Sequence, residues 1–139
     1  MSGIDTAQFA ASLTDYLHAL EQSNVDEVVA LFAPQATIYS PLLGWVSPAS
    51  FYRKLADASG NSKITLLDIF HSSQGSRRAT AYFRYDWVLK DHSTVSFDCV
   101  DVFDFTVDGL IEKLVIIYDT HTIRADLGDR FSKACSEND

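Results

Sequence analysis

The sequence predicts an α+β domain in which three helices near the N-terminus pack on a highly curved, mostly antiparallel sheet. Up to about residue 60 the apolar residues recur with helical spacing, and from Lys63 onward they alternate with polar residues. The connections between the later segments are short, which makes neighbouring strands antiparallel. A curved sheet closed by helices often leaves an internal pocket for a small apolar ligand.

The first helix is expected from Asp5 to about residue 22. Asp5 can cap its N-terminus, because Gln8 stands at the third helical position. The apolar side chains of this segment fall on one stripe, at Phe9, Leu13, Tyr16, Leu17 and Leu20.

Two further helices follow. One begins at Asn24 and stops before Pro34, since the residue before a proline disfavours helical geometry. The other lies between Ser47, its capping residue, and Gly60, its stop signal, with Pro48 at the first helical position.

A short strand is expected over residues 36–40, between the second and third helices. After the third helix the alternation of apolar and polar residues predicts four longer strands, joined by short turns that include Asp108-Gly109. These strands span residues 63–71, 78–90, 94–106 and 110–121.

Length and composition indicate one globular domain over residues 1–139. The content of 47% hydrophobic and 22% charged residues is typical of a protein with a core. The net charge of −8, with dispersed Lys and Arg, argues against nucleic acid as a partner, because such binding needs a basic face. No segment has the length of a membrane span, and the N-terminal stretch lacks a signal-peptide pattern. We therefore expect a cytoplasmic protein without membrane contact.

Motifs for a metal or a cofactor are missing from the sequence. The histidines are scattered, and there is no glycine-rich phosphate loop. Cys99 and Cys135 have neither metal-type spacing nor the pattern of a disulfide framework, and we expect both to be reduced. The sequence predicts neither a metal site nor a cofactor.

Asp101 interrupts an otherwise apolar row in the segment "VSFDCVDVFDF". Side chains alternate between the faces of a strand, so Asp101 shares a face with Val95, Phe97, Cys99, Phe103 and Phe105. A carboxylate there must be paired, solvated or neutral. A second apolar row in residues 79–89 matches this face, and the two rows form either a filled core or the wall of a pocket.

Two stretches carry a resemblance to a known family. The segment "YLHALEQSNVDEVVALFAPQATIYSP" resembles the opening of the ketosteroid isomerase and SnoaL-like polyketide cyclase group of the nuclear-transport-factor-like superfamily. The segment "VDVFDFTVDGLIEKLVIIYD" is similar to its closing strand pair. The resemblance covers about residues 5 to 125 and implies a cone-shaped, cystatin-like roll with an internal pocket, and a homodimer.

The resemblance also implies roles for individual residues. The tyrosine of the isomerase oxyanion hole falls on Tyr16, and its protonated aspartic acid falls on Asp101. Two such donors would stabilise negative charge on a carbonyl oxygen. The position of the general-base aspartate is taken by Ser40, whose hydroxyl cannot shuttle a proton near neutral pH.

These observations predict a pocket for a small, largely apolar, carbonyl-bearing molecule. Tyr16 and Asp101 are the candidate catalytic residues for cofactor-free isomerisation, cyclisation or dehydration. The candidate substrate-binding residues are Ser40, Phe83, Tyr85, Trp87, Phe103, Ile116 and Tyr118.

Two other functions remain open. The chain can be a non-catalytic ligand-binding or dimerisation domain whose outer sheet face supplies a twofold interface. Epoxide hydrolases of this fold use an Arg-x-Asp pair, to which Arg84 and Asp86 correspond, but their last-strand aspartate falls on Ile116. Alternation also puts Arg84 and Asp86 on the polar face, as a surface ion pair.

Each candidate residue also has a structural explanation. Tyr16 can be a core tyrosine, and Asp101 can sit on a bulge or bind backbone amides. Ser40 can satisfy the backbone at the end of its strand. Asp119 lies opposite to the inward positions of the last strand and is expected at the surface.

Overall fold

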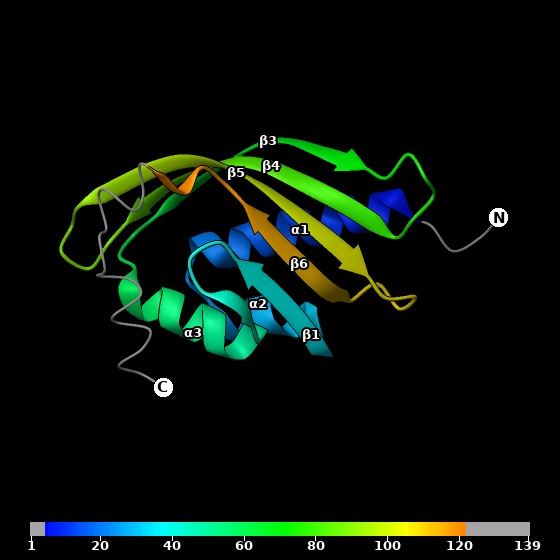
Figure 1. Ribbon diagram of the computed structural model, residues 1–139, viewed down its shortest axis with the longest axis horizontal. Coiled ribbons are helices and arrows are strands. Elements are labelled where there is room, and N and C mark those ends of the chain that lie inside the picture. Colours follow the sequence, from blue (N-terminus) through cyan, green and yellow to red (C-terminus); the bar gives the residue numbers. More distant parts are fainter. Residues whose placement is uncertain (1–4, 122–139) are drawn as a thin grey trace.

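The predicted α+β architecture is confirmed by a computed structural model of the chain, which describes residues 5–121. Three helices cover the concave face of one curved, open sheet of six strands (Figure 1). The helices are α1 (Thr6–Glu21), α2 (Val25–Ala30) and α3 (Pro48–Ala58). The strands are β1 (Phe32–Ser40), β2 (Gly44–Val46), β3 (Lys63–His71), β4 (Arg78–Val88), β5 (Thr94–Phe105) and β6 (Ile111–Ile117).

The helix caps form as the sequence predicts. The Gln8 backbone N–H donates to Asp5 Oδ1 at 3.0 Å, at the start of α1. Asn24 caps α2 through its side-chain oxygen, and Ser47 caps α3 in the same way. These bonds satisfy backbone donors that a helix leaves unpaired in its first turn, so the caps fix where each helix begins.

The second helix is shorter than predicted, and the strand after it is longer. Helix α2 ends at Ala30, and β1 already begins at Phe32, so Pro34 lies inside a strand. The pairing of β1 with β6 is irregular between Phe32 and Thr37. Proline has no N–H to donate to a ladder, and this interruption is where a strand tolerates it.

The sheet has the strand order β2-β1-β6-β5-β4-β3. All neighbours are antiparallel except β1 and β6, which run parallel. Strand β2 was not expected; it forms a hairpin with β1, and its first residue, Gly44, has a φ of +76°. Strand β3 has the predicted bounds, and β4, β5 and β6 are each shorter than predicted.

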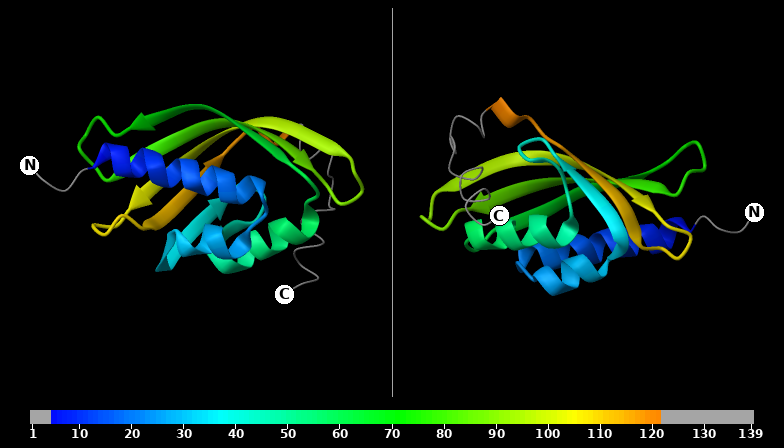
Figure 2. Two further views of the ribbon diagram at one scale, coloured as in Figure 1. Left: turned by 180° about the vertical axis from the view of Figure 1, so that it is seen from behind. Right: turned by 60° about the horizontal axis from the view of Figure 1, so that its bottom comes forward.

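Helix α1 lies across the concave face of the sheet, with α2 and α3 beside its C-terminal half (Figure 2). The predicted apolar stripe of α1 faces the sheet and is buried, at Phe9, Leu13, Tyr16, Leu17 and Leu20. The three helices and the curvature of β4 and β5 leave a space between α3 and the sheet. Within residues 5–121, no helix has the length and apolarity needed to cross a membrane.

Candidate functional site

A pocket lies between the helices and the concave face of the sheet. The pocket has a cavity volume of about 50 Å³ and is partly open to solvent. A cavity of this size can hold a few water molecules or one end of a larger ligand, whose remainder would lie in the open part of the pocket. More than half of the lining side chains are aromatic, and the full lining is Tyr16, Leu20, Ser40, Phe51, Leu55, Phe83, Tyr85, Trp87, Phe97, Cys99, Asp101, Ile116 and Tyr118.

Asp101 is buried in the wall of this pocket. Its side chain faces inward, with 2% of the residue exposed, and its neighbours on the adjacent strands are Ala81 and Ile116. The pairing of β5 with both strands is regular at this position, so no bulge turns Asp101 to solvent. Its Oδ1 atom has no hydrogen-bond partner among the described residues. Burial raises the pKa of the Asp101 carboxyl well above its usual range, because the charged form loses its hydration.

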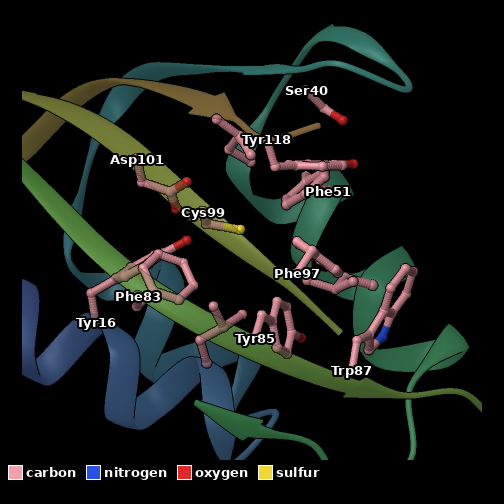
Figure 3. A pocket seen from close by; sticks show the side chains of 13 residues that line it. Tyr16, Ser40, Phe51, Phe83, Tyr85, Trp87, Phe97, Cys99, Asp101 and Tyr118 are labelled. Atoms are coloured by element: carbon pink, nitrogen blue, oxygen red, sulfur yellow. The ribbon is translucent and has the colours of Figure 1, made fainter. Parts of the chain in front are cut away.

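Tyr16 reaches the same pocket from α1. Its hydroxyl lies 2.6 Å from the hydroxyl of Tyr52 on α3, and either oxygen can donate. Burial raises the pKa of Tyr16, and the nearby Tyr52 and Asp101 raise it further. In Figure 3 the Tyr16 hydroxyl and the Asp101 carboxyl point toward the same region of the pocket. When the Tyr52 hydroxyl is the donor in this bond, the Tyr16 hydroxyl can donate its own hydrogen bond to a ligand.

The sequence did not predict that Tyr52 contributes to this site. It is 2% exposed and lies on the face of α3 that also buries Phe51 and Leu55. The helical spacing of these three residues predicts burial, but nothing in the sequence places a hydroxyl of α3 against one of α1.

Ser40 lines the pocket at the end of β1. Its Oγ atom accepts hydrogen bonds from the backbone N–H groups of Leu42 at 3.3 Å and Leu43 at 3.4 Å. These bonds close the turn between β1 and β2, which confirms the structural explanation for Ser40. In Figure 3 its hydroxyl points away from Asp101.

Most of the predicted substrate-binding residues do line the pocket: Ser40, Phe83, Tyr85, Trp87, Ile116 and Tyr118. Phe103 does not, and its assignment to the pocket was wrong. It is fully buried and packs against the Tyr16 ring, with centroids 5.0 Å apart. Phe103 follows Asp101 on the inward face of β5, where α1 already covers the sheet.

Five lining residues were not named from the sequence as site residues. Phe97 and Cys99 lie on the same inward face as Asp101, and their alternation was visible in the sequence. Leu20, Phe51 and Leu55 come from helices, and only the packing of α1 and α3 against the sheet shows which helical residues meet the pocket.

Arg84 and Asp86 face away from the pocket. The Arg84 Nε atom lies 3.4 Å from Asp86 Oδ1, and Arg84 also contacts Asp98 at 3.6 Å. This placement confirms the expected surface ion pair and gives the pocket no Arg-x-Asp pair. Asp119 follows β6, and its carboxylate accepts from the His121 backbone N–H.

The described residues contain no group of three His, Cys, Asp or Glu side chains that could hold a metal ion. Cys99 is a buried free thiol, as expected, whereas Cys135 lies outside the described residues. Burial raises the pKa of the Cys99 thiol, and Asp101 raises it further. Cys99 is therefore a protonated wall residue and not a nucleophile at neutral pH.

Comparison with known proteins identifies the family. A family model described as a SnoaL-like domain matches residues 13–114, and the chain belongs to this family. No curated protein matches the sequence.

Several solved structures share the fold. SalBIII, described as an epoxide hydrolase/cyclase-like enzyme in pyran ring formation of the polyether salinomycin, is 18% identical, with a TM-score of 0.71 over 83% of this chain and 93% of its own. PrhC from Penicillium brasilianum is 13% identical, with a TM-score of 0.75 over 93% and 92%. A protein of unknown function with a cystatin-like fold from Methylobium petroleophilum is 15% identical, with a TM-score of 0.71 over 84% and 78%. At these identities the likeness shows the fold alone.

Asp101→Asn is expected to gain stability relative to the wild type as the pH rises. The folded-state pKa of Asp101 is raised, so the folded protein keeps a proton that the unfolded chain releases above about pH 4. The stabilising contribution of this proton is full below the unfolded pKa and is lost as the pH rises to the folded pKa, by about 1.4 kcal/mol per pH unit. Asparagine does not titrate.

Urea unfolding of both proteins between pH 4 and pH 8 measures this difference. Asp98→Asn, on the outer face of the same strand, is the matched control and should show no such trend. A stability difference between Asp101→Asn and the wild type that is independent of pH would show that Asp101 is not held neutral.

Proposed function

We propose that this domain binds a small, largely apolar molecule through a carbonyl group and polarises that group with Tyr16 and Asp101. The proposed outcome is cofactor-free isomerisation, cyclisation or dehydration. The observation that carries the proposal is the buried Asp101 Oδ1 atom, which has no partner in the described protein and lies in the wall of the pocket. An unsatisfied buried polar atom costs about 1–3 kcal/mol, which a ligand that supplies the missing hydrogen bond would recover.

The chemistry follows from the protonation states of the two groups. Burial raises the pKa values of both groups, and the proposal takes both as protonated at neutral pH. Each can donate a hydrogen bond to a carbonyl oxygen, which makes the carbonyl carbon more electrophilic and stabilises negative charge on the oxygen. Because these donors are held in place by the fold, they need little reorganisation during the reaction.

Proton abstraction from carbon has no obvious carrier among the described lining residues. Ser40 occupies the place where the isomerase group has its base, and its hydroxyl closes a turn. A bound water can take that role, or the reaction can be one that needs only an activated carbonyl, such as attack by a nucleophile of the same molecule. The description of SalBIII, which shares the fold, names pyran ring formation.

The competing proposal is a binding domain without catalysis. A binding domain would use the same pocket and the same contacts, but it would not convert the ligand into a product. The epoxide hydrolase-like alternative has less support, because Arg84 and Asp86 lie on the outer face of the sheet.

The two donors are expected to give a ketone an affinity advantage over its hydrocarbon isostere. Acetophenone and ethylbenzene differ at one position, where a carbonyl replaces a methylene. A neutral hydrogen bond contributes about 0.5–1.5 kcal/mol, so Tyr16→Phe or Asp101→Leu should each reduce the ratio of the two affinities by about two- to tenfold. NMR titration of both ligands measures the ratio, and an unchanged ratio in both variants would remove the donor roles.

Ser40→Asp is expected to create or strongly increase isomerisation of a β,γ-unsaturated ketone. The substitution supplies a carboxylate where the related isomerases have their base, and general-base catalysis contributes about 10²–10⁴-fold. The small cavity, of about 50 Å³, favours entry of the carbonyl end of cyclohex-3-enone over entry of a steroid, although Δ5-3-ketosteroids are tested alongside.

Ser40→Asn is the matched control for this experiment. Its amide can accept the bonds from Leu42 and Leu43 as an aspartate can, but it cannot accept a proton from carbon. Conversion by Ser40→Asp alone, lost again when Asp101→Ala is added, supports the isomerase-like geometry. Binding of the ketone by Ser40→Asp without conversion would favour the binding domain.

We also propose that a second copy of the chain covers the outer face of the sheet. A row of mostly apolar side chains crosses all six strands in register, through Trp45, Tyr39, Val115, Val102, Thr80 and Phe70. Ile117 and Val100 extend this band on the next row and are 49% and 37% exposed. An exposed apolar band with charged borders is typical of a protein interface.

The charges on the two sides of this outer band are complementary. One side has the row Lys113, Asp104 and Arg78, in which Asp104 pairs with both cations. The other side has Arg84 between Asp86 and Asp98. A twofold axis along the band would set the net positive side of one copy against the net negative side of the other, as a self-complementary interface requires.

The wild type is expected to sediment as a dimer at micromolar concentration. Val100→Lys should give a monomer, because it places a charge in the outer band. Val107→Lys, in the turn before β6 where Val107 is 77% exposed, is the matched control and should remain dimeric. A wild-type monomer at this concentration would contradict the interface.

A further inference from the structure

The ionisable groups in the pocket wall are all acids. No Lys, Arg or His side chain belongs to the described lining, whereas five protic groups do. They are Tyr16, Tyr85, Cys99, Asp101 and Tyr118.

A negative charge in this pocket has no positive partner in the described protein. Burial raises the pKa of Asp101, and it does the same for Tyr16, Tyr85 and Cys99. A charge on Asp101 would raise these other pKa values further, so ionisation of one acid opposes that of the next. The wall can ionise at low cost only when the ligand itself carries a positive charge.

The aromatic side chains of the pocket are suited to a positive charge on a ligand. Aromatic side chains surround the space, and the faces of aromatic rings attract cations. The protein carries a net charge of −8, which favours the approach of cations over anions at low ionic strength.

We propose that the pocket binds an apolar ligand that carries a tertiary or quaternary ammonium group, with the Asp101 carboxylate as its counterion. A tertiary ammonium group would donate its N–H to the unpartnered Oδ1 atom of Asp101, and a quaternary ammonium group would pair with the carboxylate through its charge alone. This inference rests on the proposed function only in taking the cavity as a ligand site, and it adds a second class of ligand to the carbonyl compounds.

The protons balance in either mode of entry. A quaternary ammonium ion enters from solution, the Asp101 O–H bond breaks, and the proton passes to the buffer. A neutral tertiary amine instead takes that proton onto its nitrogen, and no proton leaves the pocket. The product in both cases is an ammonium–carboxylate pair with no net charge in the pocket.

Binding of a quaternary ion is therefore linked to pH through Asp101. The affinity should rise about tenfold per pH unit while Asp101 is protonated in the free protein, and should be constant above its pKa. Four other titratable groups that face Asp101 have raised pKa values and keep their protons in this range: Tyr16 from α1, Tyr52 from α3, Tyr85 from β4 and Cys99 from β5. Tyr118, in the segment after β6, also lines the pocket.

A matched pair of ligands tests the proposal. Benzyltrimethylammonium and neopentylbenzene have the same shape and differ by the replacement of a quaternary nitrogen by carbon. Trp45→Phe leaves Trp87, in the pocket wall, as the only tryptophan, and its fluorescence then reports binding of either ligand. We expect the ammonium ion to bind at least tenfold more tightly than the hydrocarbon at pH 7, with the release of one proton at lower pH in calorimetry.

Asp101→Asn is expected to lower the ratio of the two affinities at least tenfold and to remove its pH dependence. Asp98→Asn removes the same charge from the outer face of β5 and should leave the ratio unchanged. If Asp101→Asn does not fold, the pH dependence and the proton release of the wild type still decide the question.

The outcomes separate this inference from the proposed function. Binding of neopentylbenzene and acetophenone but not of the ammonium ion would overturn the inference and leave the carbonyl site standing. Equal, pH-independent binding of the ion by wild type and Asp101→Asn would also overturn it. Failure of all three ligands to bind would remove the ligand site itself.

Discussion

Burial of the Asp101 carboxyl is the constraint on which the arrangement of the pocket depends. The group lies on the inward face of a central strand, and its neighbours across the sheet are the apolar residues Ala81 and Ile116. Because neither neighbour can donate a hydrogen bond, the carboxyl avoids the cost of a buried charge by staying protonated. An unsatisfied buried polar atom costs about 1–3 kcal/mol, and this cost is the reason for the proposal that Asp101 meets a ligand.

The surrounding elements determine what this carboxyl can meet. Helix α1 crosses the concave face and brings Tyr16 to the pocket, where Tyr52 of α3 holds its hydroxyl at 2.6 Å. Phe103 packs against the Tyr16 ring and does not line the pocket. In the proposed binding mode, a ligand in the pocket would therefore meet Tyr16 and Asp101 and not Phe103.

The electrostatics of the site limit the chemistry that it can perform. Its donors are acids with raised pKa values, and the described wall contains no base. Such a site favours reactions that need an activated carbonyl, and it balances positive charge on a ligand better than negative charge. Both proposals rest on the same carboxyl, which would donate a hydrogen bond when neutral and pair with a cation when ionised.

Much of the fold could be predicted from the sequence, because its signals are local. The caps at Asp5, Asn24 and Ser47 and the alternation from Lys63 onward define most elements. The end of α2 could not be placed, since Pro34 suggests a helix boundary but lies within β1 where its pairing is interrupted. Strand β2 has three residues, too few to show a period.

The sequence predicted the orientation of side chains correctly where strand alternation decides it. It placed Asp101 and the aromatic residues of β4 on the inward face. It failed for Phe103 and Tyr52, because their roles depend on where α1 and α3 lie against the sheet, which sequence spacing within one element does not show.

The infrared spectrum of a bound ketone tests the central claim most directly. With acetophenone labelled with ¹³C at its carbonyl carbon, the stretching band of the bound carbonyl can be separated from protein absorption. Hydrogen bonds from Tyr16 and Asp101 should shift this band below its frequency in water, and Tyr16→Phe should reverse part of the shift. A bound carbonyl that absorbs at its frequency in a hydrocarbon solvent would contradict the role of these two donors.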